Sequence, residues 1–231
     1  MAGNQKSKGF QEFKQIMARL SWPERLEYLW EYYKWVLFAA FVVVIIIGII
    51  STCVYQMQLE TLFAGHAVNV DINAAGTAYV TDQWFDLLGG VEGDHEVNLY
   101  TTQFQDPEAN RMDYNGASAM SVLLLISSQD LDYVIMDAEG MGYIAKQGVF
   151  APLEKLLTPE QLSQISEDRF IFLQDENGNT FPGAIDISEL PFVRDCVTGD
   201  GPIYIAFPGN TPRAALSAQF WDYLLSWEAE N

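Results

Sequence analysis

Acidic, amide and hydroxyl side chains follow three of the strands that hydrophobic patterning predicts in this chain. The candidates for ligand binding are Asp71, Asn73, Asp137, Glu139, Asp186 and Ser188, with Tyr143 as an aromatic stacking surface. Carboxylates, amides and aromatic rings of this kind form hydrogen bonds and stacking contacts with small polar solutes. Ligands of open α/β sheets bind at the carboxyl ends of strands, where these residues are expected. The same side chains also suit helix caps and turns, and Asp137 is a natural N-cap.

The clearest catalytic and nucleotide-binding motifs are missing from the sequence. It contains no G-x-x-x-x-G-K-[ST], H-E-x-x-H, C-x-x-C or G-x-S-x-G pattern. Residues 140–145 (GMGYIA) fit G-x-G-x-x-A, but Asp137 and Glu139 in the same turn would repel a pyrophosphate. His66 and His95 are too few for a His-rich metal site, and we expect both to be strand residues with ordinary partners. The sequence therefore predicts no catalytic residues, no metal and no cofactor.

One uncharged stretch, residues 35–59, divides the chain into two parts of different charge. Its centre, residues 36–50 (VLFAAFVVVIIIGII), has no polar side chain. A helix rises about 1.5 Å per residue, so about 20 residues cross the hydrocarbon layer of a membrane. We therefore predict a transmembrane helix over residues 35–58.

The charges on either side of this helix predict its orientation. Residues 1–34 carry six basic and four acidic side chains, whereas residues 60–231 carry six basic and 27 acidic ones. The positive-inside rule places residues 1–34 in the cytoplasm as an amphipathic segment and residues 59–231 outside the cell membrane. The strongly acidic outer domain argues against binding to nucleic acid or anionic headgroups.

Two features of the N-terminal part allow more than one interpretation. A cleaved signal peptide, or a lipoprotein processed at Cys53, competes with an uncleaved signal anchor, which the long segment before the apolar core favours. Ser21, Pro23 and Glu24 predict a helix start with a capping box. The helix that follows suits either the inner surface of the membrane or docking to another membrane protein.

Strands and helices alternate along the outer domain. Strands are expected over residues 63–70, 96–102, 131–136, 169–174, 180–186 and 203–207. Helices are expected over residues 77–88, 116–127, 138–147, 152–157 and 159–165, with a last helix opening at Thr211. Asn115 is expected to cap the second of these helices, after a loop over residues 104–115, and residues 175–179 (DENGN) to form a hairpin turn rather than a calcium loop. The pattern predicts an α/β fold with a mixed, mostly parallel sheet and flanking helices.

Several segments of this domain resemble the extracellular solute-binding proteins of ABC importers. They are residues 132–137 (DYVIMD), 142–148 (GYIAKQG), 151–154 (APLE), 177–186 (NGNTFPGAID) and 211–215 (TPRAA). The resemblance implies a strand that delivers an acid to a ligand cleft. Members of that family have two lobes and about twice this length, so the domain is similar to one lobe. The whole arrangement also resembles uncharacterised single-pass membrane proteins of Gram-positive bacteria.

Two functions follow from these expectations. The first is non-catalytic recognition of a small solute, such as a sugar or peptide, beside a membrane transporter. The second is a protein-interaction or scaffold module of the cell envelope that has lost ligand binding. A cleft with convergent polar side chains would favour the first, and an exposed apolar surface the second.

Overall fold

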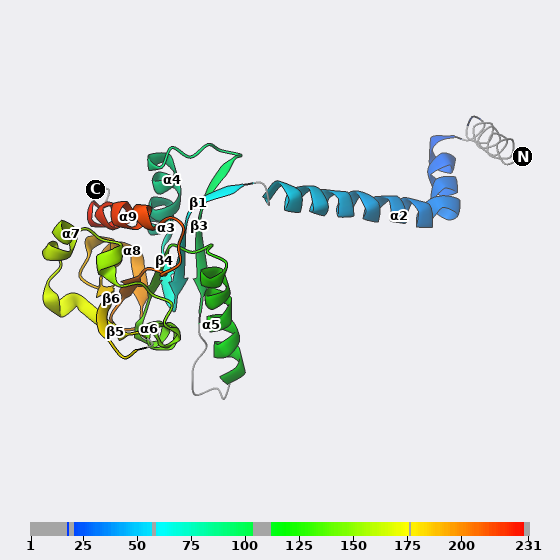
Figure 1. Ribbon diagram of the computed structural model, residues 1–231. Helices are drawn as coiled ribbons and strands as arrows, with labels where there is room; N and C mark the ends of the chain where they lie inside the picture. Colours follow the sequence, from blue (N-terminus) through cyan, green and yellow to red (C-terminus); the bar gives the residue numbers. More distant parts are fainter. Residues whose placement is uncertain (1–17, 19–20, 57–58, 104–111, 176, 229–231) are drawn as a thin grey trace, which may run out of the picture. The chain divides into compact units, whose positions relative to one another are not determined.

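The computed structural model describes residues 18, 21–56, 59–103, 112–175 and 177–228 (Figure 1). The chain divides into two compact units, Met1–Gln58 and Leu59–Asn231. Each unit is described by itself.

The first unit contains one long helix, α2 (Trp22–Gln56). It begins directly after Ser21, with Pro23 in its first turn. The expected inner helix and membrane helix form one continuous helix. No proline follows Pro23 within it, and the single glycine, Gly48, does not end it. The segment Lys34–Thr52 has the length and composition to cross a membrane, and none of it is buried against other parts of the described chain. A core helix of a globular domain would be buried.

Six strands of the second unit form one sheet in the order β3-β1-β4-β8-β6-β5. They are β3 (His95–Thr102), β1 (Glu60–Val68), β4 (Tyr133–Met136), β8 (Tyr204–Ala206), β6 (Thr180–Asp186) and β5 (Phe170–Gln174). β1 is parallel to β3 and β4, whereas β8 is antiparallel to both β4 and β6. Strand β6 therefore runs in the same direction as β4, and only β8 and β5 are reversed. The predicted mixed, mostly parallel sheet is confirmed.

A second, two-stranded sheet pairs β2 (Val70–Ile72) with β7 (Val197–Gly199). One strand over residues 63–70, followed by a loop, was expected from the sequence. This prediction is wrong, because Asp71 and Ile72, expected in the loop, belong to β2. Asn69 adopts the left-handed region (φ 57°) and ends β1, and the chain then continues as β2. Neither β7 nor the helix before it, α8 (Pro191–Cys196), was predicted from the sequence.

Helices cover both faces of the main sheet (Figure 1). One face packs against α3 (Ala74–Ala78), a π-helix (Tyr79–Gln83), α4 (Trp84–Leu87), α8 and α9 (Ala214–Leu225). The other face packs against α5 (Met112–Ser127) and α6 (Ala138–Ile144), which continues as a 3-10 helix, η3 (Ala145–Gln147). The short elements η4 (Leu153–Lys155), α7 (Pro159–Gln164) and η5 (Glu167–Arg169) connect η3 to β5. Successive residues of β1, such as Phe63 and Ala64, enter opposite cores, as the alternation of a strand requires.

Several helix boundaries differ from those expected. Helix α5 begins at Met112, so Asn115 lies inside it and is not its cap, while residues 104–111 lie outside the described residues. The helix expected from Thr77 begins at Ala74, because Asn73 caps it by accepting the Gly76 N–H. Helix α9 begins at Ala214, not at Thr211. The hairpin turn is confirmed, since Asp175 Oδ1 accepts the N–H groups of Asn177 (2.9 Å) and Asn179 (2.8 Å).

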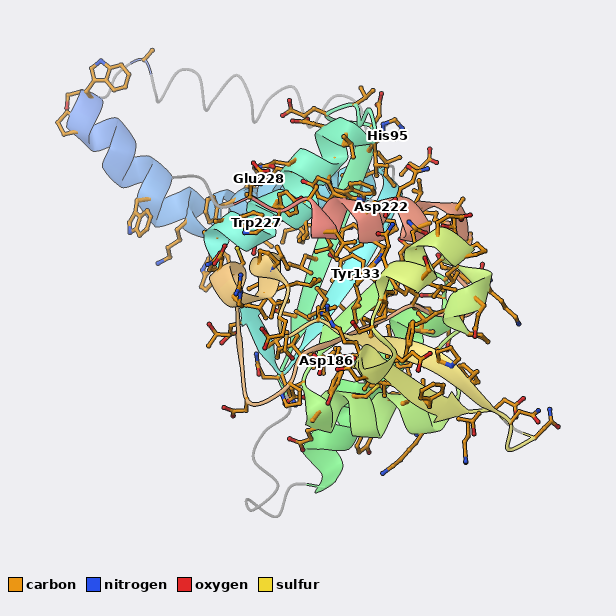
Figure 2. The ribbon with its side chains drawn as sticks, turned by 90° about the vertical axis from the view of Figure 1, so that its left-hand side faces the viewer. His95, Tyr133, Asp186, Asp222, Trp227 and Glu228 are labelled. Atoms are coloured by element: carbon orange, nitrogen blue, oxygen red, sulfur yellow. The ribbon has the colours of Figure 1, made fainter. Side chains whose placement is uncertain are left out.

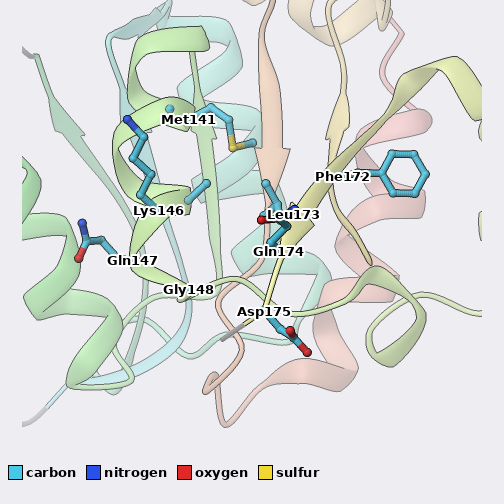
Figure 3. Close-up of a pocket in the computed structure, with 10 residues that line it drawn as sticks. Met141, Lys146, Gln147, Gly148, Phe172, Leu173, Gln174 and Asp175 are labelled. Carbon is cyan, nitrogen blue, oxygen red and sulfur yellow. The ribbon is translucent and has the colours of Figure 1, made fainter. Parts of the chain in front are cut away.

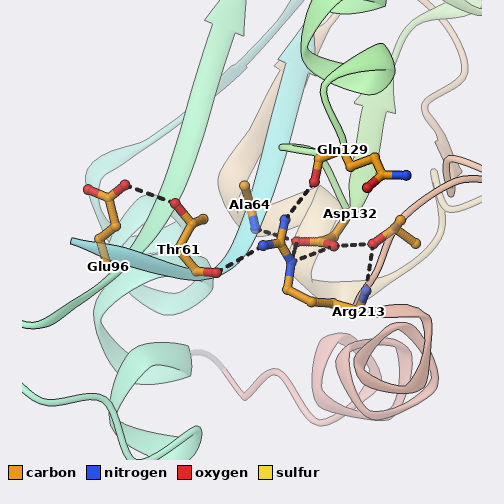
Figure 4. A network of polar contacts seen from close by, with 7 residues as sticks. Thr61, Ala64, Glu96, Gln129, Asp132 and Arg213 are labelled. Carbon is orange, nitrogen blue, oxygen red and sulfur yellow. Dashed lines mark hydrogen bonds and ion pairs between the residues drawn. The ribbon is translucent and has the colours of Figure 1, made fainter. Parts of the chain in front are cut away.

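A buried ion pair joins the start of α9 to the amino ends of β1 and β4 (Figure 4). Asp132 is fully buried, and Arg213 Nε donates to both of its carboxylate oxygens at 2.9 Å. The Ala64 N–H (2.8 Å) and the Thr211 hydroxyl donate to the same carboxylate. Arg213 Nη1 also donates to the Thr61 carbonyl at 2.9 Å. These bonds fix α9 on the sheet and so position the residues at its far end.

Candidate functional site

The two candidates after β1 are held by neighbouring segments. Asp71 lies in β2 opposite Thr198, and its carboxylate accepts a hydrogen bond from Gln103 Nε2 at 3.1 Å. Asn73 caps α3 through the Gly76 N–H (2.9 Å), and its Nδ2 donates to the carbonyl of Asp195 at 3.0 Å. Asn73 therefore connects the start of α3 to the end of α8.

The candidates after β4 lie on α6. Asp137, which is 6% exposed, caps this helix as predicted, accepting the Gly140 N–H at 2.7 Å. It also accepts a hydrogen bond from Asn69 Nδ2 at 3.2 Å, which links the carboxyl ends of β1 and β4. Glu139 and Tyr143 are exposed on α6. The bonds of Asp137 give it a structural role that does not depend on a ligand.

The candidates after β6 form a closed turn. Asp186 Oδ1 accepts hydrogen bonds from the Ser188 N–H (2.9 Å) and hydroxyl (2.6 Å). The Ile203 N–H donates to Ser188 Oγ at 2.9 Å, so the turn is bonded to the segment that precedes β8. Burial, and secondarily the Asp186 carboxylate, raise the pKa of Tyr204 in the adjacent strand. Asp186, the last residue of β6, is labelled in Figure 2.

The structure thus places the seven predicted residues in three groups that follow strands β1, β4 and β6. The Asn69–Asp137 hydrogen bond joins the first two groups. Within these groups, Asn73 lines a pocket of about 530 Å³ that several other polar and aromatic residues share. Contact of all seven with a ligand stays a prediction.

We call this hollow the α3–α9 pocket. Its lining comes from the start of α3, the π-helix, the end of α8 and the residues after α9. The polar and aromatic residues in it are Asn73, Tyr79, Gln83, Asp195, Trp227 and Glu228. Figure 2 shows Trp227 and Glu228 at the end of α9, close to the helices that follow β1. Three chain segments, residues 73–83, 195–196 and 227–228, therefore meet at one concave site.

Aromatic contacts make one wall of the α3–α9 pocket rigid. The Tyr79 ring stacks on Tyr223 with a centroid distance of 4.1 Å, and the Trp227 ring meets Tyr79 edge-on at 4.7 Å. The Tyr79 hydroxyl donates to the Tyr223 carbonyl at 2.6 Å, and burial raises its pKa. Trp227 Nε1 donates to Asp195 Oδ2 at 3.0 Å. These bonds hold both rings in place before any ligand arrives.

The remaining polar groups of the α3–α9 pocket are free to bind. Asp195 Oδ1, the Gln83 amide and the Glu228 carboxylate have no hydrogen-bond partner within the described part of the chain. The residues that line the pocket include two carboxylates and no basic side chain. Carboxylates beside aromatic rings bind organic cations, because the ring face and the negative charge both attract an ammonium or guanidinium group.

The α3–α9 pocket contains one potential nucleophile, Cys196, but its surroundings do not activate it. The side chain is buried, and burial with the nearby Asp195 charge raises the pKa of the thiol. A thiol with a raised pKa is a weak nucleophile, because the thiolate is the reactive form. In the described ranges, no group of three or more His, Cys, Asp or Glu residues is arranged to hold a metal ion.

Of the residues that line the α3–α9 pocket, only Asn73 was among the candidates predicted from the sequence. Trp227 lies just after the last helix ends and was not among the candidates. Asp195 belongs to a helix that was not predicted. No spacing in the sequence relates residues 73–83, 195 and 227–228, because only the packing of α3, α8 and α9 brings them together.

Comparison of the chain with family models, curated proteins and solved structures found no match.

Proposed function

We propose that this chain is a membrane-anchored, non-catalytic recognition protein that binds a small cationic solute in the α3–α9 pocket. The observation that carries the proposal is the pocket itself, which combines two carboxylates, two aromatic rings and amide groups in about 530 Å³. Pockets of this volume suit small organic ligands, and a few convergent polar groups fix their orientation. The acidity of the whole domain would raise the local concentration of such a cation.

The proposed topology rests on α2 and on the charge distribution. The 19 residues Lys34–Thr52 form a helix of about 28 Å, close to the thickness of the hydrocarbon layer. The basic excess of residues 1–34 favours a cytoplasmic N-terminus, which leaves residues 59–231 outside. A tethered binding domain at this surface suits delivery of a solute to a transporter, as the resemblance to one lobe of a solute-binding protein also implies.

Thermal unfolding of the full chain in detergent micelles tests the proposal. Choline, L-arginine and spermidine serve as cationic probes, with glucose and a neutral dipeptide as uncharged ones. A binding cation at a hundredfold excess over its Kd should raise Tm by about 5–10 °C for a domain of this size. The uncharged probes should produce little change.

Matched variants assign the binding to the pocket. Asp195→Asn removes a carboxylate that lines the pocket and whose Oδ1 has no hydrogen-bond partner in the described residues, so it should abolish the shift. Asp222→Asn removes an exposed acid on α9 that does not line the pocket, so it should leave the shift unchanged (Figure 2). Equal shifts in both variants, or no shift with any cation, would contradict the proposal. Stabilisation by glucose or the dipeptide alone would be consistent with recognition of a solute but would refute the proposal that the solute is a cation.

A further inference from the structure

Strand β5 is the end strand of the main sheet, and its outer edge is open. It pairs with β6 on one side, and no other strand of the described chain pairs with it. Its sequence, Phe170–Gln174 (FIFLQ), contains no charge, no proline and an aromatic ring, Phe172, that is 59% exposed. Soluble proteins usually protect such edges with lysines, prolines or a covering element, because an unpaired apolar strand attracts another strand.

The hydrogen bonds of the hairpin show which groups of β5 face outward. The Asp175 N–H donates to the Asn179 carbonyl at 2.9 Å, so Asp175 faces the β6 side. Backbone N–H and C=O groups alternate in direction along a strand. Those of Leu173 therefore also point toward β6, while those of Phe172 and Gln174 point outward. The residue opposite Phe172 is Pro182, which has no N–H to offer a neighbour. Phe172 and Gln174 therefore present two N–H and two C=O groups along the open edge.

A groove runs beside this edge, between α6–η3 and β5 (Figure 3). This α6–β5 groove has a volume of about 530 Å³. Small residues at every third position, Gly142, Ala145 and Gly148, form its helical side, and a Cβ at either glycine would meet no atom within 4 Å. Phe172, Leu173 and Gln174 line its strand side, with the ring of Phe172 directed away from the helical side (Figure 3). The groove can accept alternate side chains of a strand that lies along β5.

Both lysines of the outer domain lie at this site. Lys146 lines the α6–β5 groove, and Lys155 lines an adjoining pocket of about 410 Å³ that shares Gln174 and Asp175 with it. Neither lysine forms an ion pair within the described part of the chain. Asp175 lines both hollows as well, so the two lysines leave the site with one excess positive charge. In a domain with 27 acidic side chains, this local excess favours a partner with acidic groups at the matching positions.

We propose that the edge of β5 binds an extended, acidic segment of a partner protein as an additional strand of the sheet. The main-chain groups of Phe172 and Gln174 supply the pairing. The α6–β5 groove and the two lysines supply the selectivity, in the manner of other β-strand additions. This site is separate from the α3–α9 pocket, so partner docking does not depend on the solute.

Differential selection from a displayed library of random nonapeptides tests this proposal on the full chain in detergent micelles. Peptides are selected on the native chain and counter-selected on Phe172→Pro, which removes an outward N–H without removing a bond to β6. We expect enrichment of alternating sequences with acidic residues. Amide hydrogen exchange at Phe172 and Gln174 should slow when a selected peptide binds.

Charge variants provide a second measurement that does not rely on the proline. Lys146→Glu should weaken the binding of a selected peptide about fivefold to tenfold. Arg194→Glu makes an equal charge change at an exposed residue of α8 and should leave peptide binding unchanged. The proposal is overturned if no peptide distinguishes the native chain from Phe172→Pro, or if both charge variants behave alike. It is also overturned if Phe172→Pro converts a dimer to a monomer, because the edge would then serve a second copy of the chain.

Discussion

Replacing Arg213 with alanine should destabilise the outer domain far more than loss of a surface ion pair. The guanidinium donates to both oxygens of Asp132, at 2.9 Å each, and to the carbonyls of Thr61 (2.9 Å) and Gln129 (3.3 Å). Asp132 is fully buried, so after the substitution its charge would keep only the Ala64 N–H and the Thr211 hydroxyl as donors.

The magnitude follows from that burial. Removing one partner of a buried ion pair costs about 3–5 kcal/mol, because the remaining charge is left uncompensated in a medium of low dielectric. For a domain of this size, each kcal/mol lowers Tm by about 2–4 °C, which predicts a fall of about 6–20 °C. Arg213→Lys keeps the charge but loses the planar donor fork, so its cost should be intermediate.

Thermal and urea unfolding of the full chain in detergent, followed by near-UV circular dichroism, measures these effects. Adding Asp132→Asn to Arg213→Ala removes the orphaned charge and should recover more than about 1 kcal/mol. A loss below about 1 kcal/mol for Arg213→Ala would refute the reasoning, because that is the value of an exposed pair. Absence of any recovery in the double variant would also refute it.

Three further predictions concern other parts of the chain. His66 is 2% exposed and its pKa is lowered to about 4 by burial, so the unfolded chain takes up the proton first as pH falls. The unfolding free energy should therefore fall by about 2 kcal/mol from pH 6.5 to pH 5, and His66→Gln should remove this pH dependence. The same pH dependence in the native chain and in His66→Gln would contradict the prediction. Gly65→Ala places a Cβ 2.0 Å from the Tyr133 ring and should lower the unfolding free energy in urea by about 1–3 kcal/mol. The loss caused by Gly65→Ala should be smaller when Tyr133→Leu is also present. Additive losses for the two substitutions would be inconsistent with this clash. Ile46→Arg adds about 2.5–3.5 kcal/mol to membrane insertion and should increase the fraction extracted by alkaline carbonate, whereas Ile46→Leu should not.

Local features of the fold were predictable because they depend on neighbours in the sequence. Asp137 caps α6 by bonding the N–H three residues later, and the 175–179 turn closes on its own aspartate. The alternation of strands and helices depends on the same short-range patterns, and so the α/β class was predicted. The start of α5 was not, because residues 112–115 look polar in sequence but continue the helix.

The residues of the candidate pocket were predicted only in part for a related reason. Ligand binding by the polar side chains after the strands stays a prediction, and several of them bond to their own chain, as Asp186 and Ser188 do. The α3–α9 pocket depends instead on Asp195 and Trp227, which join through one hydrogen bond across 32 residues. Sequence patterning carries no signal for a contact of that kind.

The amino-acid sequence alone determines the apolar stretch of α2 and the acidic charge of residues 59–231, since both depend only on which residues are contiguous or present. Tertiary structure decides that β8 inserts between β4 and β6 and that β5 is left at an open edge. It also pairs Asp132 with Arg213, 81 residues later. These outcomes depend on how distant segments share one buried core, where many side chains must be packed and every buried charge must find a partner.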